Sequence, residues 1–64
     1  MKENYEYQIW KTDGYGDYEL ITTFHISKTG LAIMKWEELR KDCVERMITD
    51  YTYELVIEER EPTI

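Results

Sequence analysis

One segment of this 64-residue chain is long and periodic enough to form a stable helix, and it runs from Ser27 to Asp50. At 100° per residue, several of its apolar side chains form one continuous stripe, the pattern of a helix that packs on a sheet. That stripe comprises Ala32, Trp36, Leu39, Cys43 and Met47. Ser27 is expected to cap the start of the helix, with Thr29 as the competing choice, because a hydroxyl oxygen can accept a hydrogen bond from an unpaired backbone N–H. The rest of the chain must supply the layer against which this helix packs.

Three segments with alternating side chains predict the strands of that layer. They cover residues 4–11, 18–26 and 51–58. Residues 12–17 contain two glycines and two aspartates, which favour the backbone conformations of a turn. We therefore predict that the first two strands form a β-hairpin.

The resulting element order, β-β-α-β, predicts an α+β fold with one helix packed on one face of a three-stranded sheet. The third strand can join the first strand in an antiparallel pair or the second in a parallel pair. Antiparallel pairs are more common, which favours an antiparallel sheet of order 2-1-3. Residues 1–64 form a single domain, with an ordered core at about 4–58 and a tail at 59–64 that contains Pro62. The helix-covered face is expected to hold Tyr5, Tyr7, Ile9, Leu20, Phe24, Ile26, Tyr53, Leu55 and Ile57.

The chain is acidic, with 14 acidic residues against eight basic ones and a formal net charge of -6. This balance argues against direct binding to nucleic acid or to an anionic membrane, because both need a basic surface. It favours a basic or neutral protein partner, and the alternative is that the charge only maintains solubility. The N-terminal residues do not resemble a signal peptide, and no apolar run approaches the roughly 20 residues of a membrane span. We therefore expect a cytoplasmic protein.

The sheet face opposite the helix is the first candidate for a binding surface. Its predicted residues include four glutamates and three large apolar side chains but no lysine or arginine, and apolar groups on an open face often mark an interaction site. The alternative is that Trp10 covers the hairpin and that Ile21 and Val56 reflect strand propensity. The predicted partner-binding residues are Glu6, Trp10, Glu19, Ile21, Glu54, Val56 and Glu58.

A flank of the helix is the second candidate surface. Ile33, Val44 and Ile48 form an apolar group beside the main stripe, with Glu37 and Arg40 between them. A small domain with one cysteine cannot form an internal disulfide, so association is a plausible source of stability. We expect a homodimer that forms through this flank, through the open sheet face or through a strand edge.

Enzymatic chemistry is not expected. His25 is predicted on the open sheet face and Cys43 on the buried helix stripe, so they lie in different layers and do not form a nucleophile–base pair. Residues 13–17 lack the remaining ligands of a calcium loop, and a single His and a single Cys do not make a structural zinc site. We expect no catalytic residue, no metal site and no cofactor.

In its size, acidity and strand–strand–helix–strand order over residues 4–58, the chain resembles small bacteriophage proteins that disable a host enzyme or defence system. It is similar in architecture to the phage inhibitor of uracil-DNA glycosylase. That resemblance implies a homodimer of ββαβ units that acts as a DNA mimic in the host cytoplasm, with carboxylates in place of phosphates. It rests on architecture alone and assigns a role to no individual residue.

Two functional expectations follow. The first is a stoichiometric inhibitor or regulator, active in host takeover, that binds a nucleic-acid-binding or defence protein without catalysis. The second is a self-associating interaction module of a phage or bacterial assembly, without DNA mimicry.

Overall fold

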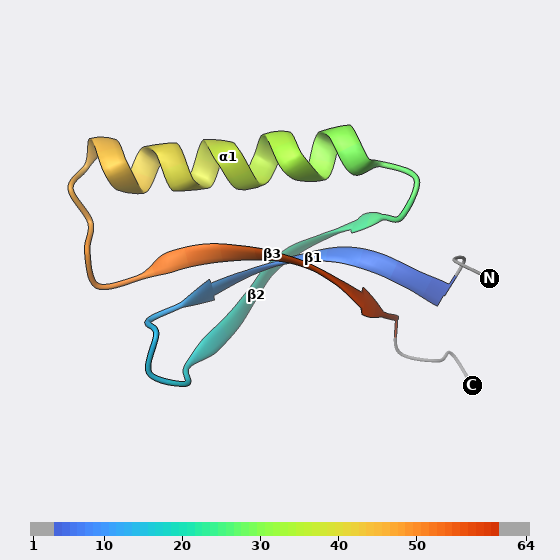
Figure 1. Ribbon diagram of the computed structural model, residues 1–64, viewed down its shortest axis with the longest axis horizontal. Coiled ribbons are helices and arrows are strands. Elements are labelled where there is room, and N and C mark those ends of the chain that lie inside the picture. Colours follow the sequence, from blue (N-terminus) through green and yellow to red (C-terminus); the bar gives the residue numbers. More distant parts are fainter. Residues whose placement is uncertain (1–3, 61–64) are drawn as a thin grey trace.

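The computed structural model describes residues 4–60 and contains four elements in the predicted order. They are β1 (Tyr5–Thr12), β2 (Tyr18–His25), α1 (Thr29–Glu45) and β3 (Thr52–Glu59). The strands form one sheet of order β2-β1-β3, in which both pairs are antiparallel. The helix lies as a second layer across one face of the sheet (Figure 1). The predicted α+β fold and strand order are therefore confirmed.

The two layers make a thin slab with extents of 40 × 26 × 14 Å. Its buried apolar residues are few: Ile9 and Ala32 are fully buried, and Cys43 is 6% exposed. Ile9 lies on the central strand, whereas Ala32 and Cys43 belong to the predicted helix stripe. The core thus sits where the sequence pattern placed it, but it is small, which limits the hydrophobic stabilisation of one isolated copy.

The helix begins at Thr29, and Ser27 does not cap it. Lys28 occupies the N-cap position without a side-chain hydrogen bond to the helix. Both the backbone N–H and the hydroxyl of Ser27 instead contact Nδ1 of His25, at 3.1 and 2.8 Å. The prediction of Ser27 as the cap was wrong because that hydroxyl is held by the end of the preceding strand.

The helix ends at Glu45, well before the predicted end at Asp50. The backbone N–H of Met47 donates to the carbonyl of Val44 at 3.1 Å, and that of Ile48 donates to the carbonyl of Cys43 at 2.9 Å. This is the Schellman pattern, and Met47 takes its left-handed position with φ 59°. The side chain of Met47 is 86% exposed, so its predicted place on the buried stripe was wrong.

The hairpin turn at residues 13–17 is organised by Asp13. Its Oδ1 accepts hydrogen bonds from the backbone N–H groups of Tyr15 at 2.7 Å and Asp17 at 3.3 Å. These bonds, that of Tyr15 above all, favour the carboxylate and lower the pKa of Asp13. Gly14 and Gly16 adopt φ values of 83° and 107°, which side chains rarely allow. The predicted turn is confirmed.

Strand β2 contains a β-bulge that the alternating pattern did not predict. Ile9 pairs with Thr22 and the next residue, Trp10, pairs with Leu20, so Ile21 is left between them. Beyond the bulge, residues 18–20 are reversed relative to a regular strand. Leu20 therefore shares the open face with Trp10. The prediction that placed Leu20 on the covered face was wrong.

Strand β3 runs from Thr52 to Glu59, so it starts and ends one residue later than predicted. Glu59, the first residue of the predicted tail at 59–64, therefore belongs to this strand, and residues 61–64, including Pro62, lie outside the described part of the chain. Within residues 4–60, no helix has both the length and the apolar character needed to cross a membrane.

Candidate functional site

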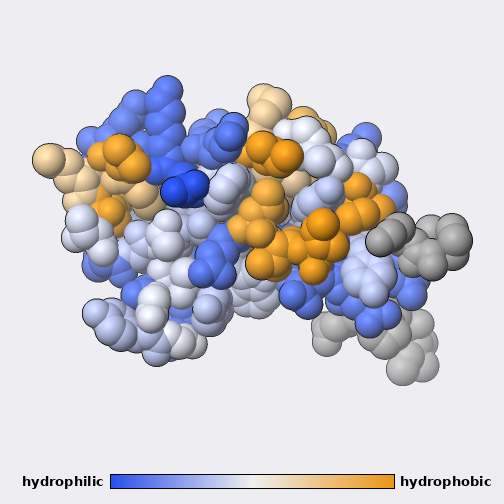
Figure 2. Space-filling model, viewed as in Figure 1, coloured by the Kyte–Doolittle hydropathy of each residue, from blue (hydrophilic) through white to orange (hydrophobic). Residues whose placement is uncertain are grey.

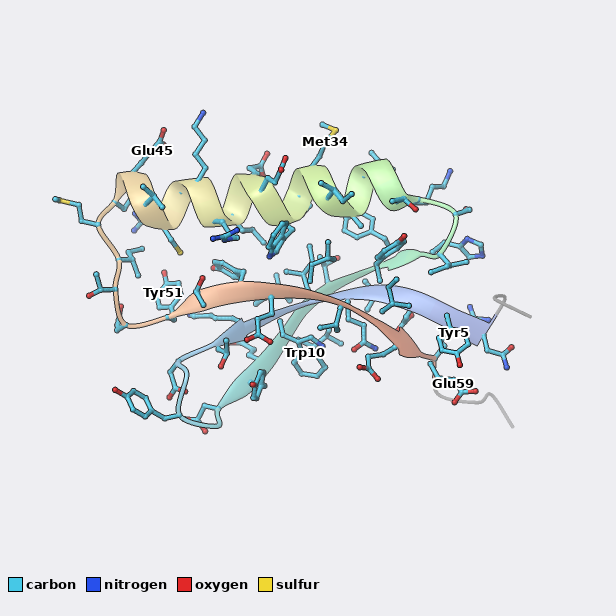
Figure 3. The ribbon with its side chains drawn as sticks, in the orientation of Figure 1. Tyr5, Trp10, Met34, Glu45, Tyr51 and Glu59 are labelled. Atoms are coloured by element: carbon cyan, nitrogen blue, oxygen red, sulfur yellow. The ribbon has the colours of Figure 1, made fainter. Side chains whose placement is uncertain are left out.

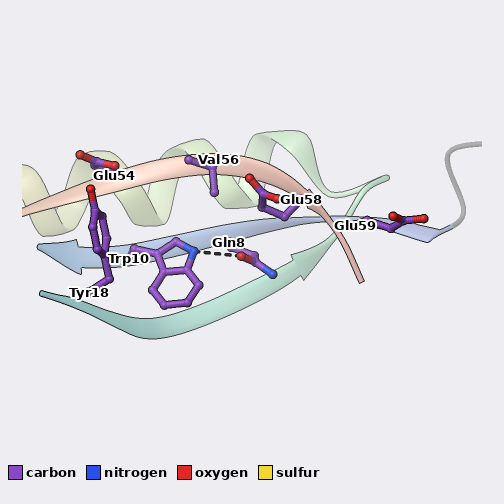
Figure 4. Close-up of a pocket in the computed structure, with 7 residues that line it drawn as sticks. All are labelled: Gln8, Trp10, Tyr18, Glu54, Val56, Glu58 and Glu59. Carbon is purple, nitrogen blue, oxygen red and sulfur yellow. Dashed lines mark hydrogen bonds between the residues drawn. The ribbon is translucent and has the colours of Figure 1, made fainter. Parts of the chain in front are cut away.

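The open face of the sheet carries a groove of about 360 Å³ over strands β1 and β3. Trp10 extends from β1 on the side of the sheet away from the helix (Figure 3). Tyr18 reaches the same groove from the start of β2, where the bulge has reversed the strand. The groove is lined by Gln8, Trp10, Tyr18, Glu54, Val56, Glu58 and Glu59 (Figure 4).

A chain of hydrogen bonds follows β1 along the floor of this face. The indole Nε1–H of Trp10 donates to Oε1 of Gln8 at 2.9 Å. The amide Nε2–H of Gln8 then donates to Oε2 of Glu6 at 2.8 Å. These three side chains occupy every second position of β1 and so lie on the same face. The two hydrogen bonds together fix the ring of Trp10 and orient the carboxylate of Glu6. The face is thereby partly organised before any partner arrives.

Trp10 and Tyr18 form the apolar corner of the groove. Their ring centroids are 6.3 Å apart and the planes are inclined by 83°, which is an edge-to-face contact. An adjoining recess of about 380 Å³ extends the surface past Leu20 and Glu6 to Glu59 and Arg60. The open face therefore combines aromatic and aliphatic groups with carboxylates.

Charge is divided between the two layers of the slab. Among residues 4–60, the helix with its caps, residues 28–46, carries five basic and four acidic side chains. The remainder carries two basic side chains, Lys11 and Arg60, against eight acidic ones. The excess negative charge of the described chain thus belongs entirely to the sheet and its loops.

Most of the predicted partner-binding residues come together on this face, but two do not. Glu6, Trp10, Glu54, Val56 and Glu58 line the groove or its adjoining recess.

Glu19, predicted on the open face, lies across from Lys11 on the helix side, and Ile21 is the residue of the bulge. Both differences arise from the single extra residue in β2, which changes the face of every side chain before it. The same change brings in Tyr18 and Leu20, which the alternating pattern had placed on the opposite face; Gln8 was on the predicted face but not among the predicted binding residues.

The predicted dimer residues lie on or beside an exposed flank of the helix. Ile33 is 38% exposed and Val44 is 76% exposed, while Ile48 is partly buried and follows the helix. Glu37 and Arg40 are exposed, and the guanidinium of Arg40 lies 4.8 Å from the ring centroid of Trp36. Leu31 and Met34 on the same helix are also exposed but were not among the predicted dimer residues. Ile57 was predicted to be covered by the helix, but it is 54% exposed because the helix does not cover its end of β3.

A second recess, of about 350 Å³, lies on the helix side of the sheet near the hairpin. There the rings of Tyr51 and Tyr53 meet edge to face at 5.9 Å, inclined by 87°. Nζ of Lys11 lies 4.1 Å from the centroid of the Tyr51 ring. Burial raises the pKa of Tyr53, and the neighbouring Tyr51, Cys43, Asp42 and Glu19 raise it further when they are ionised.

His25 and Cys43 lie in different layers, as predicted. His25 is exposed at the end of β2 and bonds to Ser27, whereas the thiol of Cys43 is buried in the helix stripe. Among residues 4–60, no group of three or more His, Cys, Asp or Glu side chains is arranged to hold a metal ion.

The fold and this surface define a small acidic α+β domain that carries a helix on one sheet face and leaves the other open. Comparison with known protein families, characterised proteins and solved structures found no match.

Proposed function

We propose that this chain is a small acidic binding protein that engages a basic surface of a protein partner through the open sheet face. The observation that carries the proposal is the division of charge between layers, because carboxylates surround an aromatic corner in a groove with no lysine or arginine among its described lining residues. Such a surface attracts cationic partners and supplies buried aromatic area once they dock. Its action is stoichiometric rather than catalytic.

A nucleic-acid-binding protein is the partner class that best fits this chemistry. Proteins that bind DNA or RNA present clusters of Lys and Arg to the phosphates. Glu6, Glu54 and Glu58 lie on one face. Glu58 pairs with Glu6 across the two strands, and Glu54 lies four residues from Glu58, which is about 13 Å along β3. We propose that these carboxylates take the place of phosphates, so that the chain inhibits or regulates a host protein as a DNA mimic. The buried unpaired thiol of Cys43 is compatible with action in the cytoplasm.

Charge reversal on the two layers tests this proposal. The variant Glu6→Lys/Glu54→Lys changes the open face, and Glu38→Lys/Glu45→Lys makes the same change in net charge on the exposed side of the helix. Each protein is used to capture partners from a bacterial lysate, and bound DNA-binding proteins are then challenged with excess duplex DNA. We expect the helix variant to retain the partner, the sheet variant to lose it, and DNA to displace it from the native chain.

The opposite results would count against distinct parts of the proposal. A sheet variant that retains its partner would exclude the open face as the binding surface. A partner that resists displacement by DNA would exclude mimicry and would favour a plain interaction module.

Self-association is the second candidate function, and exposed apolar surface favours it. Figure 2 shows hydrophobic side chains gathered between helix and sheet in the half of the molecule where the helix begins. Leu31 and Ile57 are 52% and 54% exposed, while the described core contains only three buried apolar residues. A second copy on this side would cover surface that one copy leaves in water.

The strand edges are less suited to pairing between copies. The free edge of β2 is interrupted by the bulge at Ile21, and β3 carries Glu54, Glu58 and Glu59. Bulges and charged side chains are both features that protect edges from pairing. We therefore place the dimer contact on the apolar side formed by Ile33 and Ile57. Light scattering during size exclusion should report a dimer at micromolar concentration, and Ile57→Glu should convert it to monomer; a native chain that remains monomeric would exclude the contact.

A further inference from the structure

The corner formed by Trp10 and Tyr18 has the geometry of a site for a cationic side chain. Two aromatic rings set nearly at right angles present both a face and an edge to the space between them. Glu54 lies across from Trp10 on β3 and borders the same groove. The indole N–H of Trp10 is already used by Gln8, so the ring offers its π face rather than a hydrogen-bond donor.

The opposite side of the sheet holds a comparable arrangement that is already filled. The rings of Tyr51 and Tyr53 also meet at nearly a right angle, and the ammonium of Lys11 lies over the ring of Tyr51 at 4.1 Å. Carboxylates of Glu19 and Asp50 line that recess. This chain therefore places a lysine of its own where perpendicular aromatic rings and carboxylates meet.

The groove on the open face lacks the corresponding cation among its described lining residues. Three of those seven residues are glutamates, and none is a lysine or arginine. A cation over an aromatic ring gains about 0.5–1 kcal/mol at an exposed site and about 2 kcal/mol when it is desolvated. A cationic side chain of a partner would supply the component that these seven residues lack.

We propose that the Trp10–Tyr18 groove binds an arginine side chain of the partner. This inference rests on the proposed function and specifies how the open face recognises a basic protein. The planar guanidinium stacks on an indole ring and offers a fork of N–H donors that matches the carboxylate of Glu54. Its aliphatic stem covers Val56, which lies between Glu54 and Glu58 on the same strand. Lysine matches this site less well because its ammonium is more strongly hydrated and does not stack.

Titration with short peptides tests the site directly. The probes are a Gly/Ser peptide with two arginines and the same peptide with lysine or with citrulline, which keeps the shape of arginine but is neutral. Binding is followed by NMR at the indole N–H of Trp10, which Trp36→Phe distinguishes from the other indole. We expect the arginine peptide to shift this signal to saturation, the lysine peptide to bind severalfold more weakly and the citrulline peptide to leave it unchanged.

Matched variants separate the groove from general acidity. Tyr18→Leu and Glu54→Gln should each weaken arginine-peptide binding about five- to tenfold. Tyr15→Leu and Glu45→Gln are the controls, because Tyr15 is 94% exposed at the hairpin turn and Glu45 lies on the helix. Tyr18 is itself 56% exposed, so its replacement should leave the fold intact, which the remaining amide signals will show.

The outcomes distinguish this site from the proposed function. Shifts around Glu6 and Glu58 with an unchanged Trp10 would overturn the arginine site and leave the acidic binding face standing. Equal affinity for the lysine peptide would overturn the preference for arginine. Absence of any peptide shift on the open face would also overturn the site, whereas the proposed function fails only if charge reversal leaves partner capture unchanged.

Discussion

The indole Nε1–H of Trp36 donates a hydrogen bond to the backbone carbonyl of Tyr53 at 3.0 Å and thereby fastens the helix to an edge strand. Trp36 lies on the buried stripe of α1, and Tyr53 lies on the helix-facing side of β3. Because the core is small, this polar contact between layers is expected to carry an appreciable part of the stability.

Replacing Trp36 by phenylalanine should lower the free energy of unfolding by about 1–2 kcal/mol, because the carbonyl of Tyr53 loses its indole donor. Trp10→Phe is the matched control, since its indole donates to the side chain of Gln8 on the open face, where water can replace it. The control should cost less than about 1 kcal/mol in urea denaturation. Equal losses would mean that ring volume, rather than the bond between layers, sets the cost.

Replacing Met47 by glycine should stabilise the protein by roughly 0.5–1 kcal/mol, because glycine adopts the left-handed backbone of a Schellman cap without strain. Met34→Gly is the control, since Met34 is also exposed but lies inside the helix. The control should destabilise by about 1 kcal/mol. The two substitutions are expected to move the urea midpoint in opposite directions, and a decrease for both would contradict the role of Met47 as the cap.

Deleting Ile21 should leave the strand register in place, because Thr22 and Leu20 would then pair with Ile9 and Trp10 as neighbours in a regular ladder. Nuclear Overhauser contacts between Trp10 and Tyr18 should survive the deletion. The same contacts in Ile21→Gly, which keeps the bulge, provide the reference. Their loss in the deletion variant alone would show that the bulge itself orients Tyr18.

The phenol of Tyr53 should ionise at a higher pH than an ordinary tyrosine. The pKa of Tyr53 is raised above the ordinary value of a tyrosine, chiefly because burial disfavours the phenolate. A raised pKa stabilises the fold fully below the unfolded pKa, and this contribution is lost as pH rises toward the folded pKa. The tyrosinate absorbance of the native chain should show a late step that Tyr53→Phe removes and Tyr15→Phe retains. A late step that persists without Tyr53 would contradict the assignment.

The sequence was sufficient to predict the architecture because apolar residues recur at regular helix and strand spacings in the segments whose side chains are buried. Ile9, Ala32 and Cys43 were all predicted to face the core, and all three do. The strand order followed from the preference for antiparallel pairing.

The details of the open face were not predictable, because residues 20–22, Leu-Ile-Thr, suit either face of a strand. One residue inserted in the ladder therefore left no pattern in the sequence, yet it exchanged Glu19 for Leu20 on the open face. The end of the helix was missed for a similar reason, since Met47 stands where glycine is usual and gives no stop signal.

The division of charge between helix and sheet also gives the molecule an electric dipole that runs from one layer to the other. In the field of a cationic partner, the molecule turns its sheet toward that partner before the surfaces touch. The gain is in the rate of productive encounter rather than in the lifetime of the complex, and added salt reduces that rate. Two proteins with the same net charge of -6 would differ in this respect if one of them spread its carboxylates evenly over both layers.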